Sequence, residues 1–262
     1  SLVSGLAGHL DAELEAWRHR PLTETTHPYL SVDARYEHVR QGGQIVSQGV
    51  LIVAGIRADG HREILAAAVA DTESAATYHH LFGDLKARGL SGVRLVTSDS
   101  HQGLKAAIDR HFRGASWQQC RVHVTRDLLG VVGAGRRGQL AADVREIFAA
   151  TAREQAMTTA AVVAARWKAS HPAVARLLEE EIEDGLACLA FPLAHRPRMR
   201  TTNGLERLHE EVRRRTRVVR IFPNAEACLR LVTALCVEQS EERVSGRRYL
   251  DMRDLFSGSP AR

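Results

Sequence analysis

Residues 28–39, PYLSVDARYEHV, have the pattern of a buried β-strand with one residue out of place. The aromatic and β-branched positions favour a strand, whereas aspartate is depleted in strands. Asp33 nevertheless stands in the middle of the run, between Val32 and Ala34 and away from any turn. Because a buried carboxylate is costly unless it is paired or bound to a metal, Asp33 is a candidate for chemistry rather than for packing.

Two more acids stand in comparable contexts. Asp99 ends the short apolar run VRLVTSDS, and Glu206 lies near the start of the arginine-rich segment TTNGLERLHEEVRRRTRVVR. Two-metal phosphoryl chemistry needs hard oxygen ligands that hold Mg²⁺ ions about 3.5–4 Å apart. Carboxylates on adjacent strands, with one more from a helix laid across the sheet, can supply that geometry. The three acids therefore indicate a divalent-metal site that works on a polyanion.

Both of the later acids also have a purely structural interpretation. Asp99 with Gln102 fits a capping box for a helix that begins near residue 101, and Asn203 with Glu206 fits the same motif. Taken alone, each acid is better explained as part of a cap. Asp33 has no such explanation, so capping does not account for the whole set.

Basic charge is concentrated in one part of the chain. The 262 residues carry a net charge of +5 and a pI of about 9.3, and residues 195–220 alone hold nine Arg against three Glu. These arginines fall on several helix faces, and Glu210 and Glu211 cannot pair them all. A solvated charged helix is one interpretation. Contact with the phosphates of a nucleic acid is the other, and the neighbouring Glu206 favours it.

The composition, with 44% hydrophobic and 26% charged residues, is that of an ordinary globular protein. No window approaches the roughly 20 uninterrupted apolar residues of a membrane span, and the first residues lack the pattern of a signal peptide. Most of the four cysteines, Cys120, Cys188, Cys228 and Cys236, fall in apolar helical patterns. We interpret them as small buried hydrophobes in a reducing compartment. We therefore expect a cytoplasmic protein with no membrane association.

The order of predicted elements is typical of an α/β fold. Asp59-Gly60 is a strong hairpin signal between two apolar runs, and the segment GAGRRG after Val132 is predicted to be a flexible connector. Residues 139–190 then show only helical patterns, and two further helices follow from Asn203 onward. Predicted strands cover residues 29–39, 49–58, 62–70, 93–98 and about 116–122, and predicted helices cover about 73–88 and 101–112. This order predicts a mixed sheet with helices on its faces, followed by an all-helical insertion.

Other site motifs are weak or absent. Cys120-x-x-His123 could suggest zinc, but one Cys–His pair is half a site and no second pair has metal-ligand spacing. We interpret His123 as a polar residue near the carboxylates or as a satisfied core histidine. The sequence contains no GxxxxGK[ST], no GxGxxG and no serine-hydrolase elbow, which excludes the common phosphate-loop and dinucleotide sites.

Four segments together resemble the core motifs of Mutator-type transposases of bacterial insertion sequences. They are YLSVDARYEHVR, VRLVTSDSHQGLKAAI, WQQCRVH and RTTNGLERLHEEVRRRTRVVR, in the family's order and over about residues 10–250. The resemblance implies a ribonuclease-H-like α/β fold, a mixed sheet with helices on both faces and an all-helical insertion. The expected parts are a helix and linker at 1–26, the first part of the core at 27–137, the insertion at 138–195, the rest of the core at 196–250 and a tail at 251–262.

For the site, the resemblance implies that Asp33, Asp99 and Glu206 form a DDE triad that holds Mg²⁺, with Mn²⁺ as a substitute. The reaction would be strand cleavage at element ends, followed by attack of the 3′-OH on target DNA. Cys120 and His123 match the family's C-x-x-H signature and are expected to be auxiliary. The expected DNA-binding residues are Arg200, Arg207, Arg213, Arg214, Arg215, Arg217, Arg220 and Trp167, with packing as the alternative role of the tryptophan.

The expected partners are DNA, as element ends and as target, and a second copy of the chain, with no small-molecule substrate. The expected location is the bacterial cytoplasm, in association with the nucleoid. The sequence departs from the family's pattern at Gly204-Leu205-Glu206, where Pro-Ile-Glu is usual. Against the family's usual length, we also expect most of the N-terminal DNA-binding region to be missing. Two other functions therefore stay open. One is a ribonuclease-H-like nuclease or junction resolvase that cuts without joining, and the other is an inactive fragment that binds DNA or dimerises with a full-length copy.

Overall fold

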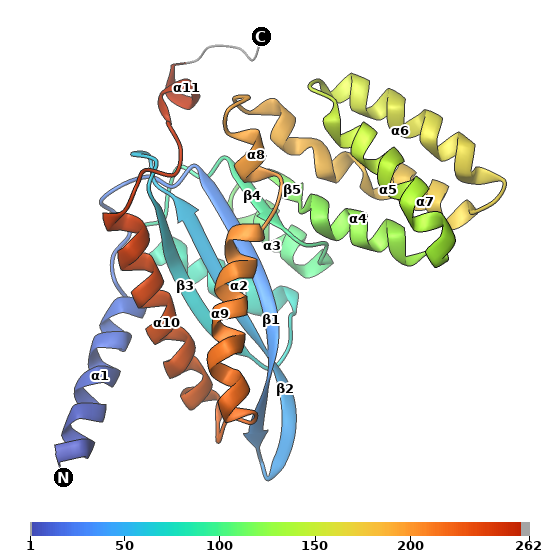
Figure 1. The fold of residues 1–262 in the computed structure, drawn as a ribbon. Helices are drawn as coiled ribbons and strands as arrows, with labels where there is room; N and C mark the ends of the chain where they lie inside the picture. Colours follow the sequence, from blue (N-terminus) through green and yellow to red (C-terminus); the bar gives the residue numbers. More distant parts are fainter. Residues whose placement is uncertain (1, 258–262) are drawn as a thin grey trace. The chain divides into compact units, whose positions relative to one another are not determined.

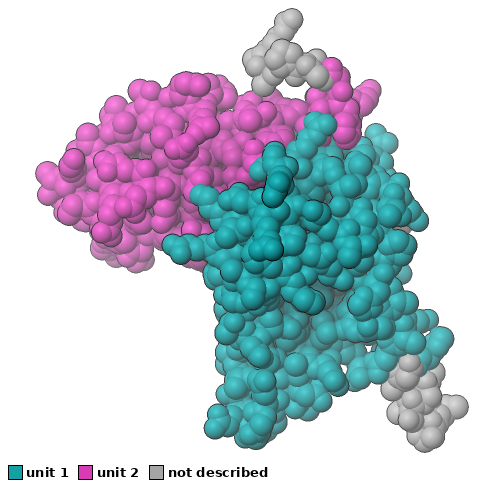
Figure 2. Space-filling model, turned by 180° about the vertical axis from the view of Figure 1, so that it is seen from behind, with its two compact units in different colours: residues 1–96, 101–115, 202–252 teal, residues 97–100, 116–201, 253–262 magenta. Residues whose placement is uncertain are grey.

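A computed structural model describes residues 2–257 of the chain, with the side chains from residue 9 onward except that of Ser245. The chain divides into two compact units, each with its own hydrophobic core (Figure 2). The first unit holds the chain up to Val96, together with His101–Ala115 and Thr202–Met252, and the second holds Thr97–Ser100, Ser116–Thr201 and the chain from Arg253 on.

Three antiparallel strands form the first part of the sheet. Gly42 and Gly43, with φ of +56° and +82°, make the tight turn between the first two strands, a conformation that suits glycine. Asp59-Gly60 turns the chain into the third strand, where Gly60 has a φ of +89°, so the predicted hairpin is confirmed. The strands are β1 (Tyr29–Gln41), β2 (Gln44–Ile56) and β3 (Arg62–Ala70).

Two short strands complete a five-stranded sheet in the order β3-β2-β1-β4-β5, so β1 is the central strand. Figure 1 shows α9 and α10 in front of the long strands and α2 with α3 behind them. The predicted mixed α/β class, with helices on both faces of the sheet, is confirmed. The added elements are β4 (Leu95–Ser98), β5 (Ser116–Gln119), α2 (Ala75–Ala87), α3 (Gln102–His111), α9 (Asn203–Val219) and α10 (Ala225–Ser245).

The core of the first unit lies between the long strands and the two C-terminal helices. Leu205, Leu208 and Val212 of α9 recur at helical spacing and pack in one cluster with Val50 and Ile52 of β2. This stripe fixes which face of α9 meets the sheet and therefore which of its polar residues face β1. The N-terminal helix α1 (Leu2–Arg18) lies beside α10, in agreement with the helix predicted there.

The cysteines are small buried residues, as predicted, and all four are free thiols. Burial raises the pKa of Cys228 and of Cys236, both on α10, to about 12. Because the thiolate is the reactive form, these two side chains are inert at neutral pH.

The second unit is built mainly from helices around a separate core. Val144 and Ile147 of α5 pack in one cluster with Val163 and Trp167 of α6 and with Leu178 of α7. None of the helices within residues 2–257 is long and apolar enough to cross a membrane. Besides β5, the second unit contains α4 (Arg121–Gly130), α5 (Ala134–Ala149), α6 (Arg153–Lys168), α7 (Pro172–Glu181), the 3-10 helix η1 (Glu183–Ala190), α8 (Arg196–Met199) and α11 (Arg253–Phe256).

One prediction about this part of the chain is wrong. The segment GAGRRG is not a flexible connector, because α5 begins at Ala134 and runs through it, with Gly133 at the N-cap. The glycines at 135 and 138 disfavour a helix by about 1 kcal/mol each. The helix forms because the same element buries Leu140, Val144 and Ile147 in the core of the unit.

Candidate active site

Asp33 lies on the central strand of the sheet, within the first compact unit. It pairs in register with Ile52 of β2 and is 7% exposed, which confirms its predicted burial. Oδ2 of Asp33 lies 3.3 Å from Nε2 of His209, a buried histidine on α9. The acid that looked out of place in the sequence therefore faces the arginine-rich helix.

The contact between Asp33 and His209 is not an ion pair at neutral pH. Burial, followed by the positive charge of Arg35, lowers the pKa of His209 from 6.5 to about 4. The imidazole is therefore neutral under ordinary conditions. Neither of its ring nitrogens makes a hydrogen bond within the part of the chain that the structure describes.

A half-buried polar network joins α9 to β1 next to Asp33. Arg35 donates from Nε to Oε1 of Glu37 at 2.8 Å and from Nη1 to the carbonyl of His209 at 3.0 Å. Thr216, two turns further along α9, donates from Oγ1 to the same Glu37 oxygen at 3.3 Å. Because these bonds engage two points of the helix, they set both its rotation and its position along the strand.

Glu206 lies in the first turn of α9, one turn before His209 on the same side of the helix. The structural alternative for Glu206 is wrong. Thr202 occupies the N-cap without a side-chain hydrogen bond, and Asn203 is already the first helical residue, so no capping box forms.

Asp99 directly follows β4, in the second compact unit. Helix α3 begins at Gln102 with His101 at its N-cap, so the predicted capping box with Asp99 as the N-cap residue does not form. Ser98 donates from Oγ to the carbonyl of Asp99 at 2.9 Å, and its own carbonyl accepts from the amide of Cys120 at 2.6 Å. These bonds tie the end of β4 to the start of α4.

Cys120 and His123 stand together at that start of α4, and both are buried. A hydrogen bond with the thiol of Cys120 raises the pKa of His123, and the negative charge of Asp99 acts in the same direction. The pair thus lies near one of the predicted triad acids, as the sequence interpretation suggested. Within the described residues, no group of three or more His, Cys, Asp or Glu is arranged to hold a metal ion.

The arginines of α9 fall into two groups. Glu211 accepts from Arg214 at 2.7 Å and from Arg215 at 3.0 Å, and these bonds lower its pKa to about 2. Arg213 and Arg217 are exposed and have no carboxylate within 4.0 Å in the described part of the chain. Arg207 and Arg220, also predicted to contact DNA, are exposed at the two ends of the same helix.

Trp167 lies in the helical core of the second unit. Its side chain is 3% exposed, and its indole Nε1 donates to Oδ2 of Asp143 at 2.7 Å. Asp143 also accepts from Arg166 at 2.7 Å. This environment supports the packing role that the sequence left open for Trp167.

Sequence reasoning missed His209, Arg35 and Glu37. Their spacing in the sequence could have indicated them. Arg35 and Glu37 lie on the same face of the strand as Asp33, and His209 follows Glu206 by three residues on a helix. These spacings predict contacts only when it is known which helix packs on which strand.

The first unit is thus an α/β fold in which a buried strand acid faces an arginine-rich helix. Residues 1–246 match the family model for the Mutator family of transposases. The chain is 44% identical over 250 residues to the transposase for insertion sequence element IS406 of Burkholderia multivorans, with 95% of this chain and 64% of that protein covered. It is 40% identical over 255 residues to the transposase for IS1081 of Mycobacterium tuberculosis, with 97% and 61% covered. The chain belongs to the Mutator family of transposases.

These relatives are longer than this chain, which spans 64% of the length of the first and 61% of the second. Among solved structures, the Drosophila P element transposase strand transfer complex matches with a TM-score of 0.31 and 7% identity, over 90% of this chain and 70% of that one. A likeness this distant carries no argument about the present site.

Proposed function

We propose that this chain carries the catalytic region of a DNA transposase that cleaves strands at the ends of an insertion sequence and joins the 3′-OH ends to target DNA. The observation that carries the proposal is the buried Asp33 on the central strand, facing α9 with Glu206 in its first turn, in a chain of the Mutator family. Asp99, which directly follows β4, is the proposed third member of a ribonuclease-H-like DDE site.

Asp33, Asp99 and Glu206 would hold divalent cations, Mg²⁺ with Mn²⁺ as a substitute. The donor set fits such ions, because all three side chains offer carboxylate oxygens, the hard ligands that Mg²⁺ prefers. When bound, such ions would supply activation of the attacking hydroxyl and stabilisation of the leaving oxygen. Cys120 and His123 would support the site from the start of α4.

The chain's own residues would orient the substrate. Arg35, Glu37 and Thr216 hold α9 against β1, so the helix offers a fixed surface. Arg213 and Arg217, exposed on that helix, would bind backbone phosphates of DNA without reading its sequence. Arg214 and Arg215 share Glu211 and would bind phosphates less readily than their unpaired neighbours. DNA ends and target are the proposed partners, with a second copy of the chain and a place in the bacterial cytoplasm as further expectations.

The test is a strand-transfer assay with element-end DNA and Mg²⁺ or Mn²⁺, applied to Asp33→Asn, Asp99→Asn and Glu206→Gln. Each variant should abolish cleavage and joining while it keeps DNA binding and an unchanged circular-dichroism spectrum. Full activity in any correctly folded variant would remove that acid from the site. Cleavage without joined products in the wild type would instead identify a nuclease, and binding without cleavage would identify an inactive fragment.

Charge reversal at Arg213 and Arg217 tests the phosphate contacts separately. Loss of two contacts to duplex DNA should reduce the slope of log affinity against log salt by about 1.8. An unchanged affinity and salt slope would show that these arginines belong to a solvated helix face.

A further inference from the structure

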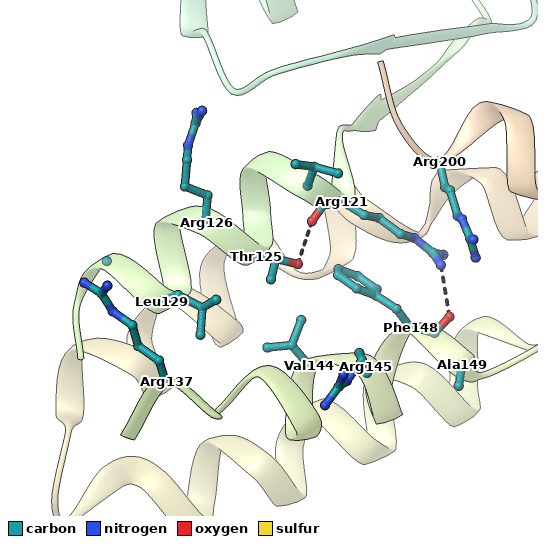
Figure 3. Close-up of a pocket in the computed structure, with 12 residues that line it drawn as sticks. Arg121, Thr125, Arg126, Leu129, Arg137, Val144, Arg145, Phe148, Ala149 and Arg200 are labelled. Carbon is teal, nitrogen blue, oxygen red and sulfur yellow. Dashed lines mark hydrogen bonds between the residues drawn. The ribbon is translucent and has the colours of Figure 1, made fainter. Parts of the chain in front are cut away.

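A cavity of about 850 Å³ lies between α4 and α5 in the second compact unit (Figure 3). All of its lining residues belong to that unit. Five guanidinium groups line the cavity and, among the described residues around it, no carboxylate does. They are Arg121, Arg126, Arg137, Arg145 and Arg200. The proposed catalytic chemistry uses none of them.

The positive charge of the cavity is largely available to a ligand. Arg137, Arg145 and Arg200 are exposed and have no carboxylate within 4.0 Å in the part of the chain that the structure describes. Arg121 is buried in the wall, where it donates to the carbonyls of Gly185 at 2.9 Å and of Phe148 at 3.0 Å. A concave surface with one sign of charge and an apolar base attracts an anion more strongly than a flat surface does.

The floor of the cavity is apolar. Figure 3 shows Leu129 of α4 directed into the space between the helices, and Val144 and Phe148 of α5 line the same space. A ligand that suits both parts must carry anionic groups next to an apolar face. A nucleotide has that composition, but in a duplex its base is stacked and only phosphates and sugars are accessible. The floor is therefore accessible only to an unpaired base.

Apart from its arginines, the cavity offers little that could read a base. The one hydroxyl of the lining, Oγ1 of Thr125, donates to the carbonyl of Arg121 at 2.7 Å (Figure 3). No side-chain amide lines it among the described residues. Binding of a base on apolar side chains, with phosphates on arginines, is tolerant of sequence because every base has an apolar face.

We infer that this pocket takes one unpaired nucleotide of a DNA strand, with the base on the floor and the flanking phosphates on Arg137, Arg145 and Arg200. The volume lies within the usual range for a site that encloses a small ligand. The inference rests on the proposed function, since that function names DNA as the polyanion. It adds a second place for DNA, specific for unpaired strands, whose lining residues all belong to the second compact unit.

The experiment measures binding of the whole chain by fluorescence anisotropy to two labelled DNAs, a paired duplex and the same duplex with one unpaired nucleotide. Ala149→Trp fills the cavity from an exposed lining position without a change of charge. Arg137→Ala with Arg145→Ala removes two of the proposed phosphate contacts. Lys168→Ala with Arg176→Ala is the matched control, since both residues are exposed in the same unit, carry the same charge and do not line the cavity.

The wild type should prefer the DNA with the unpaired nucleotide by about tenfold, in line with the stacking of one base. Ala149→Trp should remove this preference and leave affinity for the duplex unchanged. The double arginine variant should weaken binding of the unpaired DNA and reduce its salt slope by about 1.4, whereas the control should match the wild type.

Three results would overturn the inference: equal affinity of the wild type for both DNAs, a preference that survives Ala149→Trp, or a double arginine variant that behaves like its control. The double variant alters only exposed side chains, so it keeps the inference testable if the tryptophan disturbs folding. If the wild type carries out strand transfer and the pocket variants bind both DNAs as the wild type does, the pocket is rejected and the proposed function stands. A chain that binds neither DNA would reject both.

Discussion

The low pKa of His209 makes the stability of the first compact unit depend on pH in a defined window. His209 has a pKa of about 4 in the folded chain, and an unfolded histidine has a pKa of about 6.5. Between these values the unfolded chain binds a proton at this residue and the folded chain does not. The free energy of unfolding therefore falls as the pH drops from about 6.5 to about 4, and the loss stops below that range.

The size of this loss follows from the two pKa values. A pKa difference from 6.5 to about 4 corresponds to about 3 kcal/mol, at about 1.4 kcal/mol for each pH unit. That is a large fraction of the stability of a typical domain. The cause is the burial of His209 on α9, together with the positive charge of Arg35.

Urea unfolding at a series of pH values, in the presence of EDTA, would measure this contribution. His209→Gln is the informative variant, because glutamine is polar, similar in size and cannot be protonated. Carboxylates also contribute to the pH dependence, but they are shared by both proteins, so the difference between the two curves isolates His209. Identical pH dependence in wild type and variant would refute the reasoning. So would a histidine pKa near 6.5 for His209, measured by NMR in the folded chain.

Two further predictions concern polar contacts in the two cores. Arg35→Met should lower the free energy of unfolding by about 3 kcal/mol, because it leaves the buried carboxylate of Glu37 without its cation, and it should raise the pKa of His209. The exposed control Arg213→Met should cost under about 0.5 kcal/mol, and equal effects of the two variants in urea unfolding would contradict this account. Trp167→Phe should cost about 1–3 kcal/mol, because the buried Asp143 loses its indole donor, and an unchanged urea midpoint would show that this hydrogen bond contributes nothing.

Much of the fold could be predicted from local sequence. Asp59-Gly60 predicts a hairpin because few other residue pairs readily adopt the backbone angles of a tight hairpin turn. The structure has that hairpin. The helix over Gly135 and Gly138 could not be predicted in this way. Its stability comes from burial against α6 and α7, a contribution that no local preference includes.

The candidate site also has a part that local sequence predicts and a part that it does not. Asp33 is conspicuous in the sequence because a carboxylate in a buried strand is costly wherever the strand packs. The capping boxes of Asp99 and Glu206 are equally good local patterns, and neither forms. Helix α3 begins three residues after Asp99, and α9 already includes Asn203, its proposed cap residue. A capping motif depends on the exact first residue of a helix, which is the least predictable part of an element.

The sequence by itself determined the class of the fold, the buried acid and the arginine-rich helix, because each depends on residue types and on spacings within one element. The tertiary structure alone decided that Arg35 meets the backbone of His209, 174 residues away, that Thr216 meets Glu37, 179 residues away, and that the arginines of α4 and α5 share one cavity. The physical reason is that such contacts form only after the cores have fixed which helix face meets which strand. The free energy for that choice comes from apolar burial summed over a whole unit, which no single motif encodes.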